Sequence, residues 1–154
     1  MTRWLDDEEM AAWRGLVETF ADLSATLEAE LVEAHGISMG EYVTMVRLSE
    51  AENRRLRMCD LAEQLHLSAS GLTRRIEDLV RQGWVRREPD SADRRVINAV
   101  LTPEGFARLA EAAPTHVDGV RRHLLDRLTR TQIRELAGIV RAMGAVEAGT
   151  AAAR

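Results

Sequence analysis

The fold is decided by residues 61–105, which read LAEQLHLSASGLTRRIEDLVRQGWVRREPDSADRRVINAVLTPEG. Apolar residues recur three and four apart in its first half, which is the period of an amphipathic helix. This spacing predicts one helix near Cys59 to Leu65 and a second that starts after the N-cap residue Ser68 and stops at Gly83. Two helices joined by so tight a turn are typical of a helix-turn-helix motif.

The second of these helices is expected to present two different faces. Its outward face carries Ser70, Arg74 and Arg81, flanked by Gly71 and Arg75. Small residues allow close approach to a DNA major groove, where serine bonds phosphates or bases and arginine pairs with guanine. An ordinary amphipathic helix with solvated charges is the alternative. The opposite, apolar stripe is predicted to be buried and consists of Ala69, Leu72, Ile76, Leu79 and Val80.

After this helix the pattern changes to two short runs rich in Val, Ile and Trp, residues 84–88 and 96–101, with the turn-forming PDSAD between them. They predict a two-stranded hairpin, too short to form a sheet of its own, with Arg94 and Arg95 at its tip. Arginine is favoured in a narrow minor groove, and Asp93 can orient one arginine through a charge-assisted bond. A solvated loop is the alternative, and which of the two arginines reaches DNA stays open.

The segment before the motif is predicted to be helical. From residue 8 to residue 34 the apolar positions cover about half of a helix circumference, which is more than contact with one core needs. A second copy of the chain is therefore expected to cover the remainder. A further helix starts at the capping box Ser38-Met39-Gly40-Glu41 and runs to about Leu48, before a loop and a short strand around Leu56.

The segment after the motif is also predicted to be helical. One helix starts at Thr102-Pro103, and Pro114 is expected to kink or break it. A last helix starts at a capping box that begins with Thr129. The chain is thus expected to be mainly α with a small β-hairpin wing. The expected division is a helical dimerisation region (1–36 and 103–148), a DNA-binding lobe (37–102) and a flexible tail (149–154).

The order of these elements and several short motifs resemble the MarR family of winged helix-turn-helix regulators. The motifs are LAxxL, a serine-rich turn, a TR-containing helix, GxVxR, DxR and LTxxG, all within residues 61–105. The resemblance implies a homodimer with interlocked N- and C-terminal helices, each recognition helix in a major groove and each wing in the flanking minor groove. Gly71, Arg75 and Arg94 are added as neighbours of matched positions. The DNA-binding positions that the resemblance carries over are Ser68, Ser70, Thr73, Arg74 and Arg95, with Asp93 as the residue that orients the wing arginine.

The net charge of −4 over 154 residues is unevenly distributed. Residues 1–46 hold two arginines and ten acidic residues, a net charge of −8, whereas the rest of the chain carries +4. All 21 basic residues are arginine. The acidic total therefore does not exclude a nucleic-acid partner, because arginine pairs lie on the helix and the hairpin that would meet DNA.

Other chemistry is not indicated. The lone Cys59 is expected to be an inert core residue, and the four histidines, His35, His66, His116 and His123, lack the spacing of metal ligands. The sequence shows no glycine-rich phosphate loop and no nucleophile arrangement, so no enzyme activity, cofactor or metal is expected. No apolar run approaches the roughly 20 residues of a membrane-spanning helix. The N-terminus shows no export signal, and a cytoplasmic location is expected.

The prediction for function is a homodimeric, sequence-specific regulator, expected to be a repressor, that binds double-stranded DNA at a pseudo-palindromic operator. Members of the family often bind small phenolic compounds, and Trp13, Tyr42 and Met45 are candidate residues for such an effector pocket, with plain core packing as the alternative. Two other functions stay open. One is a dimeric protein-interaction module that uses the winged helix for protein contacts, and the other is a regulator released from DNA by a small phenolic effector.

Overall fold

The computed structural model describes residues 1–144 and places six α-helices, two short 3₁₀ helices and three strands in them. The expected tail 149–154 and the end of the expected helical region 103–148 lie outside the described residues. In chain order the elements are α1 (Asp7–His35), α2 (Met39–Glu50), η1 (Glu52–Arg54), β1 (Arg55–Arg57), α3 (Met58–Gln64), α4 (Ala69–Arg81), β2 (Val85–Pro89), β3 (Ile97–Leu101), α5 (Pro103–His123), η2 (Leu125–Arg127) and α6 (Arg130–Ala142).

The helix ends follow from capping residues. Ser38 Oγ accepts a hydrogen bond from the Glu41 amide at 3.2 Å, while the Glu41 carboxylate accepts one from the Ser38 amide at 2.9 Å. This confirms the predicted capping box of α2, and Thr129 starts α6 in the same way. Asp6 forms a third capping box, which the sequence pattern does not predict, at the start of α1. Gly36, with φ +66°, ends α1.

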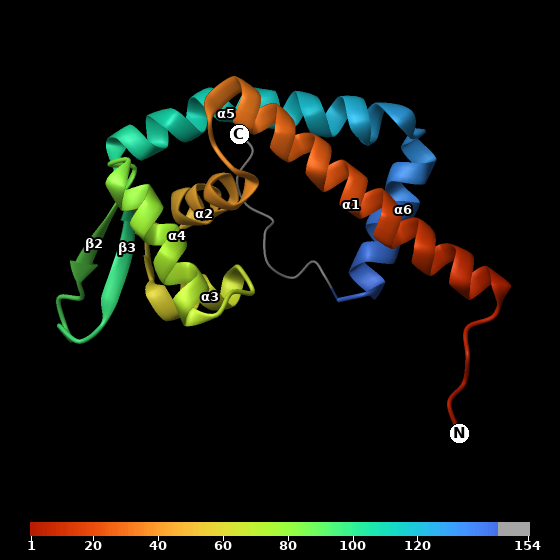
Figure 1. Cartoon of the computed structure of the whole chain (residues 1–154), viewed down its shortest axis with the longest axis horizontal. Helices are drawn as coiled ribbons and strands as arrows, with labels where there is room; N and C mark the ends of the chain where they lie inside the picture. The colour runs from red at the N-terminus through yellow and green to blue at the C-terminus, as the bar shows by residue number, and fades with distance from the viewer. Residues whose placement is uncertain (145–154) are drawn as a thin grey trace.

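The elements form a lobe and a long helical arm (Figure 1). Helices α2, α3 and α4 pack with the sheet in the lobe, whereas α1 and α5 run side by side and extend beyond it. Helix α6 lies toward the far end of the arm. Both ends of the described chain therefore contribute to the arm, and the middle of the chain builds the lobe. Within residues 1–144, no helix combines the length and the apolar character needed to cross a membrane.

The predicted hairpin is part of a three-stranded sheet. The strand order is β1-β3-β2, and both pairs are antiparallel. The short strand expected around Leu56 is confirmed, and Leu56 lies opposite Ala99 of β3. Because β3 is the central strand, its residues from Asn98 to Leu101 are buried. The hairpin is thus anchored on a core strand, which corrects the prediction of a ribbon without a sheet.

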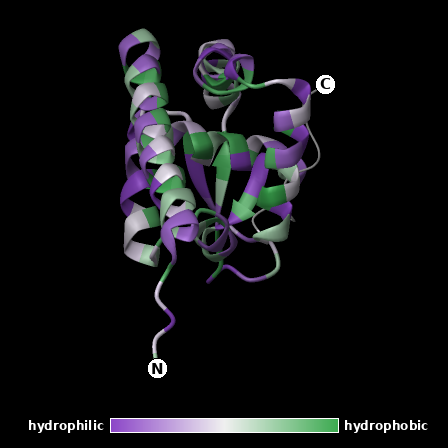
Figure 2. Ribbon diagram, turned by 90° about the vertical axis from the view of Figure 1, so that its right-hand side faces the viewer, coloured by the Kyte–Doolittle hydropathy of each residue, from purple (hydrophilic) through white to green (hydrophobic). Residues whose placement is uncertain are grey.

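The core of the lobe lies where its helices meet the sheet, and hydrophobic segments gather there (Figure 2). Leu72, Ile76 and Leu79 of α4 are buried as predicted, but Ala69 and Val80 are exposed. Each residue turns the helix by about 100°, so Val80 points away from the side that Leu79 occupies. Other elements contribute further buried side chains, among them Leu31, Ile37, Met45, Leu48, Leu61, Val85 and Leu101.

Helix α5 is continuous through Pro114. Of the two predicted outcomes, a kink or a break, the break is wrong, because the helix continues on both sides of the proline. Proline removes one backbone hydrogen bond, but packing holds the helix on both sides of it. Ala112 is buried before the proline, and Gly119 is buried after it, in contact with Leu27 and Glu30 of α1. A single rod therefore leads from the lobe into the arm.

Candidate nucleic-acid interface

Helix α4 is held in the lobe by its N-cap and its buried residues. Ser68 Oγ accepts a hydrogen bond from the Gly71 amide at 3.1 Å, so the helix starts where the sequence predicts. The turn before it contains His66 in the left-handed region, with φ +52°, which lets the chain reverse between α3 and α4. The side of α4 opposite the core is left open to solvent.

The open face of α4 carries the polar residues expected there. Ser70, Thr73 and Arg74 are exposed, and Ser70 Oγ lies 3.2 Å from Ser68 Oγ. Thr73 Oγ1 donates a hydrogen bond to the carbonyl of Ala69 at 2.8 Å, which orients its side chain along the helix. Short hydroxyl side chains beside an arginine allow a helix to approach the edges of DNA bases closely.

Arg75 lies differently from its neighbour Arg74. Its side chain is half-buried, and its guanidinium packs against Gly40 in the first turn of α2. A Cβ atom at position 40 would lie 2.8 Å from Arg75 Cζ, so glycine makes this contact possible. Both arginines nevertheless line one surface hollow of about 390 Å³, together with Ser38 and Gly71. Arg75 therefore faces the edge of the open surface rather than its centre.

The wing tip separates its two arginines. Arg95 donates hydrogen bonds from Nε at 3.1 Å and Nη2 at 3.0 Å to the Asp93 carboxylate, which also accepts the Arg95 amide at 3.0 Å. These bonds lower the pKa of Asp93 and raise the pKa of Arg95, so both groups stay ionised near neutral pH. Arg94 is exposed and makes no hydrogen bond or ion pair with any of residues 1–144. Asp93 therefore orients Arg95 and leaves Arg94 free.

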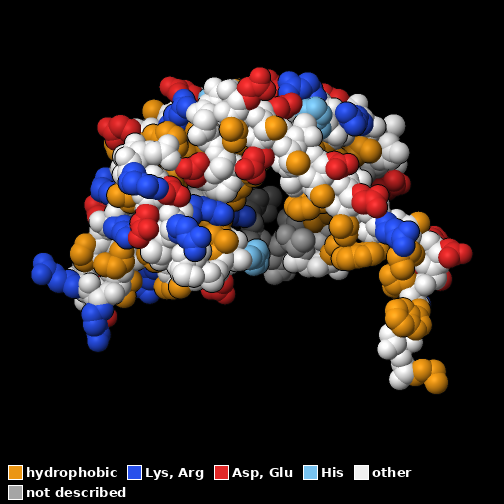
Figure 3. Space-filling model, in the orientation of Figure 1, with side chains coloured by type: hydrophobic (Ala, Val, Ile, Leu, Met, Phe, Trp, Pro, Cys, Tyr) orange, Lys and Arg blue, Asp and Glu red, His pale blue; other side chains and the backbone are white. Residues whose placement is uncertain are grey.

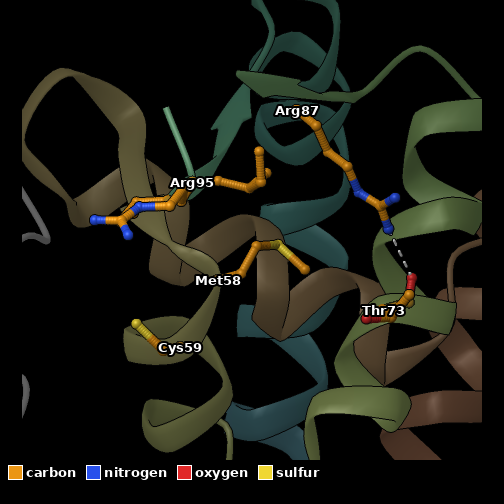
Figure 4. Close-up of a pocket in the computed structure, with 7 residues that line it drawn as sticks. Met58, Cys59, Thr73, Arg87 and Arg95 are labelled. Carbon is orange, nitrogen blue, oxygen red and sulfur yellow. Dashed lines mark hydrogen bonds between the residues drawn. The ribbon is translucent and has the colours of Figure 1, made fainter. Parts of the chain in front are cut away.

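Helix α4 and the wing border one hollow of about 470 Å³ (Figure 4). Thr73 lines it from α4, Arg87 from β2, and Arg95 from the wing tip, while Met58 and Cys59 line it from α3. Arg87 Nη2 donates a hydrogen bond to the main-chain carbonyl of Thr73 at 3.2 Å. This bond ties the wing to α4, so that the open face of the helix and the wing tip belong to one surface.

Arg87 is not among the site residues that the sequence predicts. The sequence shows it only as half of the pair Arg86-Arg87, but successive residues of a strand point to opposite faces of the sheet. On the face away from α4, Arg86 and Arg55 each donate to the Glu88 carboxylate at 2.5 Å, which lowers the pKa of Glu88. Strand alternation thus places Arg86 and Arg87 on opposite faces, and the position of α4 decides that Arg87 is the one that meets the helix.

Charge and apolar side chains are separated over the molecule. On the face shown in Figure 3, arginine side chains gather over the lobe and the wing, and hydrophobic side chains gather at the far end of the arm. The lobe end carries the charge that suits phosphate, and the arm end carries the surface that suits a protein partner.

The chain is similar to known proteins in sequence and in fold. The sequence model of the MarR family matches residues 37–97. AbsC, a MarR family transcriptional regulator from Streptomyces coelicolor, has a solved structure that is 38% identical to this chain, with a TM-score of 0.86. The match covers 93% of this chain and 96% of AbsC. The chain belongs to the MarR family.

Two further MarR-type relatives support the assignment. Sco3205, a MarR family transcriptional regulator from Streptomyces coelicolor solved in complex with DNA, is 38% identical, with a TM-score of 0.88 over 97% of each chain. The HTH-type transcriptional repressor YetL of Bacillus subtilis (strain 168) is 33% identical over 81 residues, which are 53% of this chain and 48% of YetL. The chain spans about half the length of the curated relatives it matches. The helices, the small sheet and these structural neighbours confirm the predicted fold class. MarR-family proteins are transcriptional regulators, not enzymes, in agreement with the prediction.

In this MarR-family chain, the three candidate effector-pocket residues are not brought together. Tyr42 and Met45 are buried in the lobe core, where the Tyr42 ring lies 4.7 Å from the His116 ring between centroids. Trp13 is 57% exposed in the N-terminal half of α1. At about 1.5 Å per residue it lies roughly 27 Å along the helix from Leu31, which enters the core. The expected pocket is therefore not formed by these residues within one protomer.

Cys59 is exposed, which corrects the expectation of an inert core residue. Helix α3 begins at Met58, one residue earlier than the pattern suggests, and the fully buried position of this helix is Leu61. Cys59 lies on the outer side, where its Sγ donates to Asp60 Oδ1 at 3.3 Å. Cys59 precedes Leu61 by two residues, about 200° around the helix, so the helix period places it opposite the buried side chain.

The histidines make separate contacts. His35 Nε2 lies 2.8 Å from Thr115 Oγ1, and His123 Nε2 lies 2.8 Å from a carboxylate oxygen of Glu30. Across residues 1–144, no three His, Cys, Asp or Glu side chains are grouped in a way that would hold a metal ion.

Proposed function

We propose that this MarR-family chain is a homodimeric repressor that recognises a specific double-stranded DNA sequence. In this proposal α4 is the recognition helix in the major groove, and the wing enters the flanking minor groove. The observation that carries it is the surface shared by the two elements: Thr73 and Arg95 face one hollow, and Arg87 joins helix to strand. A major groove about 12 Å wide admits a helix, and a narrow minor groove attracts arginine.

The side chains of this surface divide into three roles. The hydroxyl groups at the start of α4 bond phosphates, as helix N-termini and serines do in protein–DNA interfaces. The exposed middle of α4 contacts base edges, where a bidentate arginine–guanine pair supplies about 1–3 kcal/mol of discrimination. The wing arginines contact the minor groove. The residues assigned to these roles are Ser68, Ser70, Gly71 and Arg75 for phosphates and close approach, Thr73 and Arg74 for bases, and Arg94 and Arg95, oriented by Asp93, for the minor groove.

The arm supports a homodimer. Helix α6 is amphipathic, yet none of its residues is buried within its own protomer. Large apolar side chains of α1 and α6 are exposed, such as Phe20 at 69% and Ile139 at 58%. Large exposed apolar patches typically mark contacts with another protein. A second copy is the partner we assign, because a two-fold contact buries the same patch on each chain and covers both terminal regions at once.

A two-fold dimer fixes the form of its DNA site. Two recognition helices related by a two-fold axis read a pseudo-palindrome, with half-site centres about one helical turn, roughly 34 Å, apart. The name of the relative YetL describes a transcriptional repressor. A dimer of this kind represses when its site overlaps a promoter, and it acts in the cytoplasm, where such DNA lies.

Selection from a random-sequence duplex library tests this function. The purified protein is incubated with the library, and the retained DNA is sequenced. We expect enrichment of a pseudo-palindromic sequence. Arg74→Ala should then lower the affinity for the enriched duplex by about tenfold to a hundredfold, the range of one base-specific arginine contact.

Arg81→Ala is the matched control, because Arg81 lies on the same helix but is paired with Asp78 near its C-terminal end. Its effect should stay within about threefold, since a surface ion pair contributes little. Recovery of no enriched sequence would overturn the proposal and favour the protein-interaction module.

A further inference from the structure

The wing loop is closed from within by one carboxylate. Asp90 follows directly after β2, and its Oδ1 accepts the amide of Ala92 at 3.0 Å and the amide of Asp93 at 3.4 Å. The main chain of Asp90 also donates to the carbonyl of Val96 at 2.8 Å, on the other side of the loop. An aspartate that bonds amides two and three residues ahead stabilises a turn. Asp90 therefore defines the path of the chain toward the tip.

The second oxygen of this carboxylate binds a buried amide. Asn98 of β3 is only 2% exposed, and its Nδ2 donates to Asp90 Oδ2 at 3.1 Å. A buried polar group without a hydrogen-bond partner destabilises the fold. Asn98 lies in the central strand, so its side-chain amide would destabilise the fold without the hydrogen bond to Asp90. The amide of Ala92 and then the Asn98 side chain lower the pKa of Asp90, which keeps it an ionised and strong acceptor at neutral pH.

These bonds form a continuous path from the core to the tip. The Asn98 side chain donates a hydrogen bond to the Asp90 carboxylate, which also accepts one from the amide of Asp93. The Asp93 carboxylate in turn accepts a hydrogen bond from the guanidinium of Arg95. The backbone of Asn98 stays in the sheet in any case, because its register partners are Arg57 on β1 and Glu88 on β2. The side chain of Asn98 is thus free to serve the loop rather than the strand.

We propose that Asp90 and Asn98 form a brace that sets the conformation of the wing tip, and that both are positioning residues for DNA binding that act through Arg94 and Arg95. The proposal rests on the proposed function, because it assumes that the wing contacts DNA. Without the brace the loop samples more conformations, and binding must then order it at the expense of affinity.

A mutant cycle tests the brace with the duplex enriched from the random library, labelled for fluorescence anisotropy. Asn98→Leu keeps a similar volume but removes the donor, and Asp90→Ala removes the acceptor. Each should lower the affinity about tenfold, equivalent to about 1.4 kcal/mol, in the otherwise unchanged protein. In the Arg94→Ala, Arg95→Ala background each should change it less than about twofold, since sites that act through one another are not additive. Ser91→Ala, an exposed neighbour in the same loop, is the control and should have no effect.

The outcomes separate the brace from the function on which it rests. Equal losses in both backgrounds would overturn the brace, because they would show an effect on the fold as a whole. No loss in the unchanged background would overturn it as well. If the two arginines can be removed without loss while the duplex still binds, the wing contact of the proposed function fails and the brace falls with it.

Hydrogen exchange of the protein without DNA gives an independent readout. In Asn98→Leu and Asp90→Ala, the amides of residues 92–96 should exchange faster, while those of α4 keep their protection. Unchanged exchange in the loop would contradict the brace. If Asn98→Leu loses protection throughout, Asp90→Ala decides the outcome, because its altered side chain lies at the edge of the sheet rather than in the core.

Discussion

The guanidinium of Arg87 donates its hydrogen bond to the main chain of Thr73, not to its side chain. The hydrogen bond from β2 to α4 therefore does not depend on the Thr73 side chain, and a substitution of Thr73 leaves it in place. Arg87 is bound to the helix, whereas its neighbour Arg86 is paired with Glu88 on the other face of the sheet.

We expect Arg87→Met to lower the affinity for the enriched duplex by about twofold to tenfold, because it removes a hydrogen bond worth about 0.5–1.5 kcal/mol that keeps wing and helix in register. Arg86→Met removes the same charge from the opposite face, so it is the matched control. Anisotropy titrations of both variants measure the difference. Equal losses would point to general charge rather than to the link.

Replacing both Arg94 and Arg95 by alanine should weaken DNA binding and leave the dimer intact. Because each arginine in the minor groove also neutralises nearby phosphate charge, its loss should reduce the slope of log affinity against log salt, by about 0.9 for each phosphate no longer neutralised. Titrations at several salt concentrations give this slope. Asp93→Asn should cost less than the double replacement, because Arg95 keeps its charge but loses its orientation. An unchanged affinity in the double variant would remove the wing from the mechanism.

A charge on the exposed face of α1 should separate the dimer. Phe20→Glu puts a carboxylate in the centre of the face that we assign to the partner, and unpaired buried charge strongly opposes association. Analytical ultracentrifugation should show twice the chain mass of 17.2 kDa for the unchanged protein and the single mass for the variant. Val80→Glu, an exposed apolar position on the lobe, should remain a dimer. A dimeric Phe20→Glu variant would place the interface elsewhere.

Stability should fall as the pH drops below about 6.5, in part because of His116. Burial lowers the pKa of His116 below its ordinary value of 6.5. Just below pH 6.5 the histidine therefore binds a proton in the unfolded chain but stays neutral in the folded chain. The stability that this neutral ring contributes is complete above pH 6.5 and is lost as the pH falls through that value. Denaturant unfolding of His116→Phe between pH 7 and pH 5 should show a smaller pH dependence. The same pH dependence in His116→Phe and in the unchanged protein would contradict this prediction.

Local signals predict much of the fold. Ser38 and Thr129 mark helix starts because a cap acts on amides within three residues, which a sequence displays directly. The recognition helix and the hairpin follow from their periods in the same way. Pro114 shows where local rules end, since contacts of Gly119 with a helix about 90 residues earlier in the chain outweigh the hydrogen bond that proline removes.

The site is less visible in the sequence than the fold. The exposed positions of Ser70 and Arg74 follow from the helix period, but the roles of Arg87 and Arg75 depend on which neighbouring element lies within reach. The sequence of β2 does not predict that this strand lies beside α4. Cys59 is misplaced for a different reason: it precedes the buried Leu61 by two residues, about 200° around the helix, so the helix period itself places it on the outer side.

The unbroken course of α5 has a mechanical meaning. Strand β3 runs through Thr102 directly into this helix, so one continuous segment of chain joins the wing and the sheet to the arm. If α5 moves as one body, a small rotation at the far end of the arm moves the lobe through a larger arc. In a dimer, the distance between the two recognition helices then depends on the angle at which the two α5 helices cross. The spacing of the half-sites in the operator would therefore reflect this crossing angle, and a substitution far from DNA, at Gly119 for example, would change the spacing that the dimer prefers.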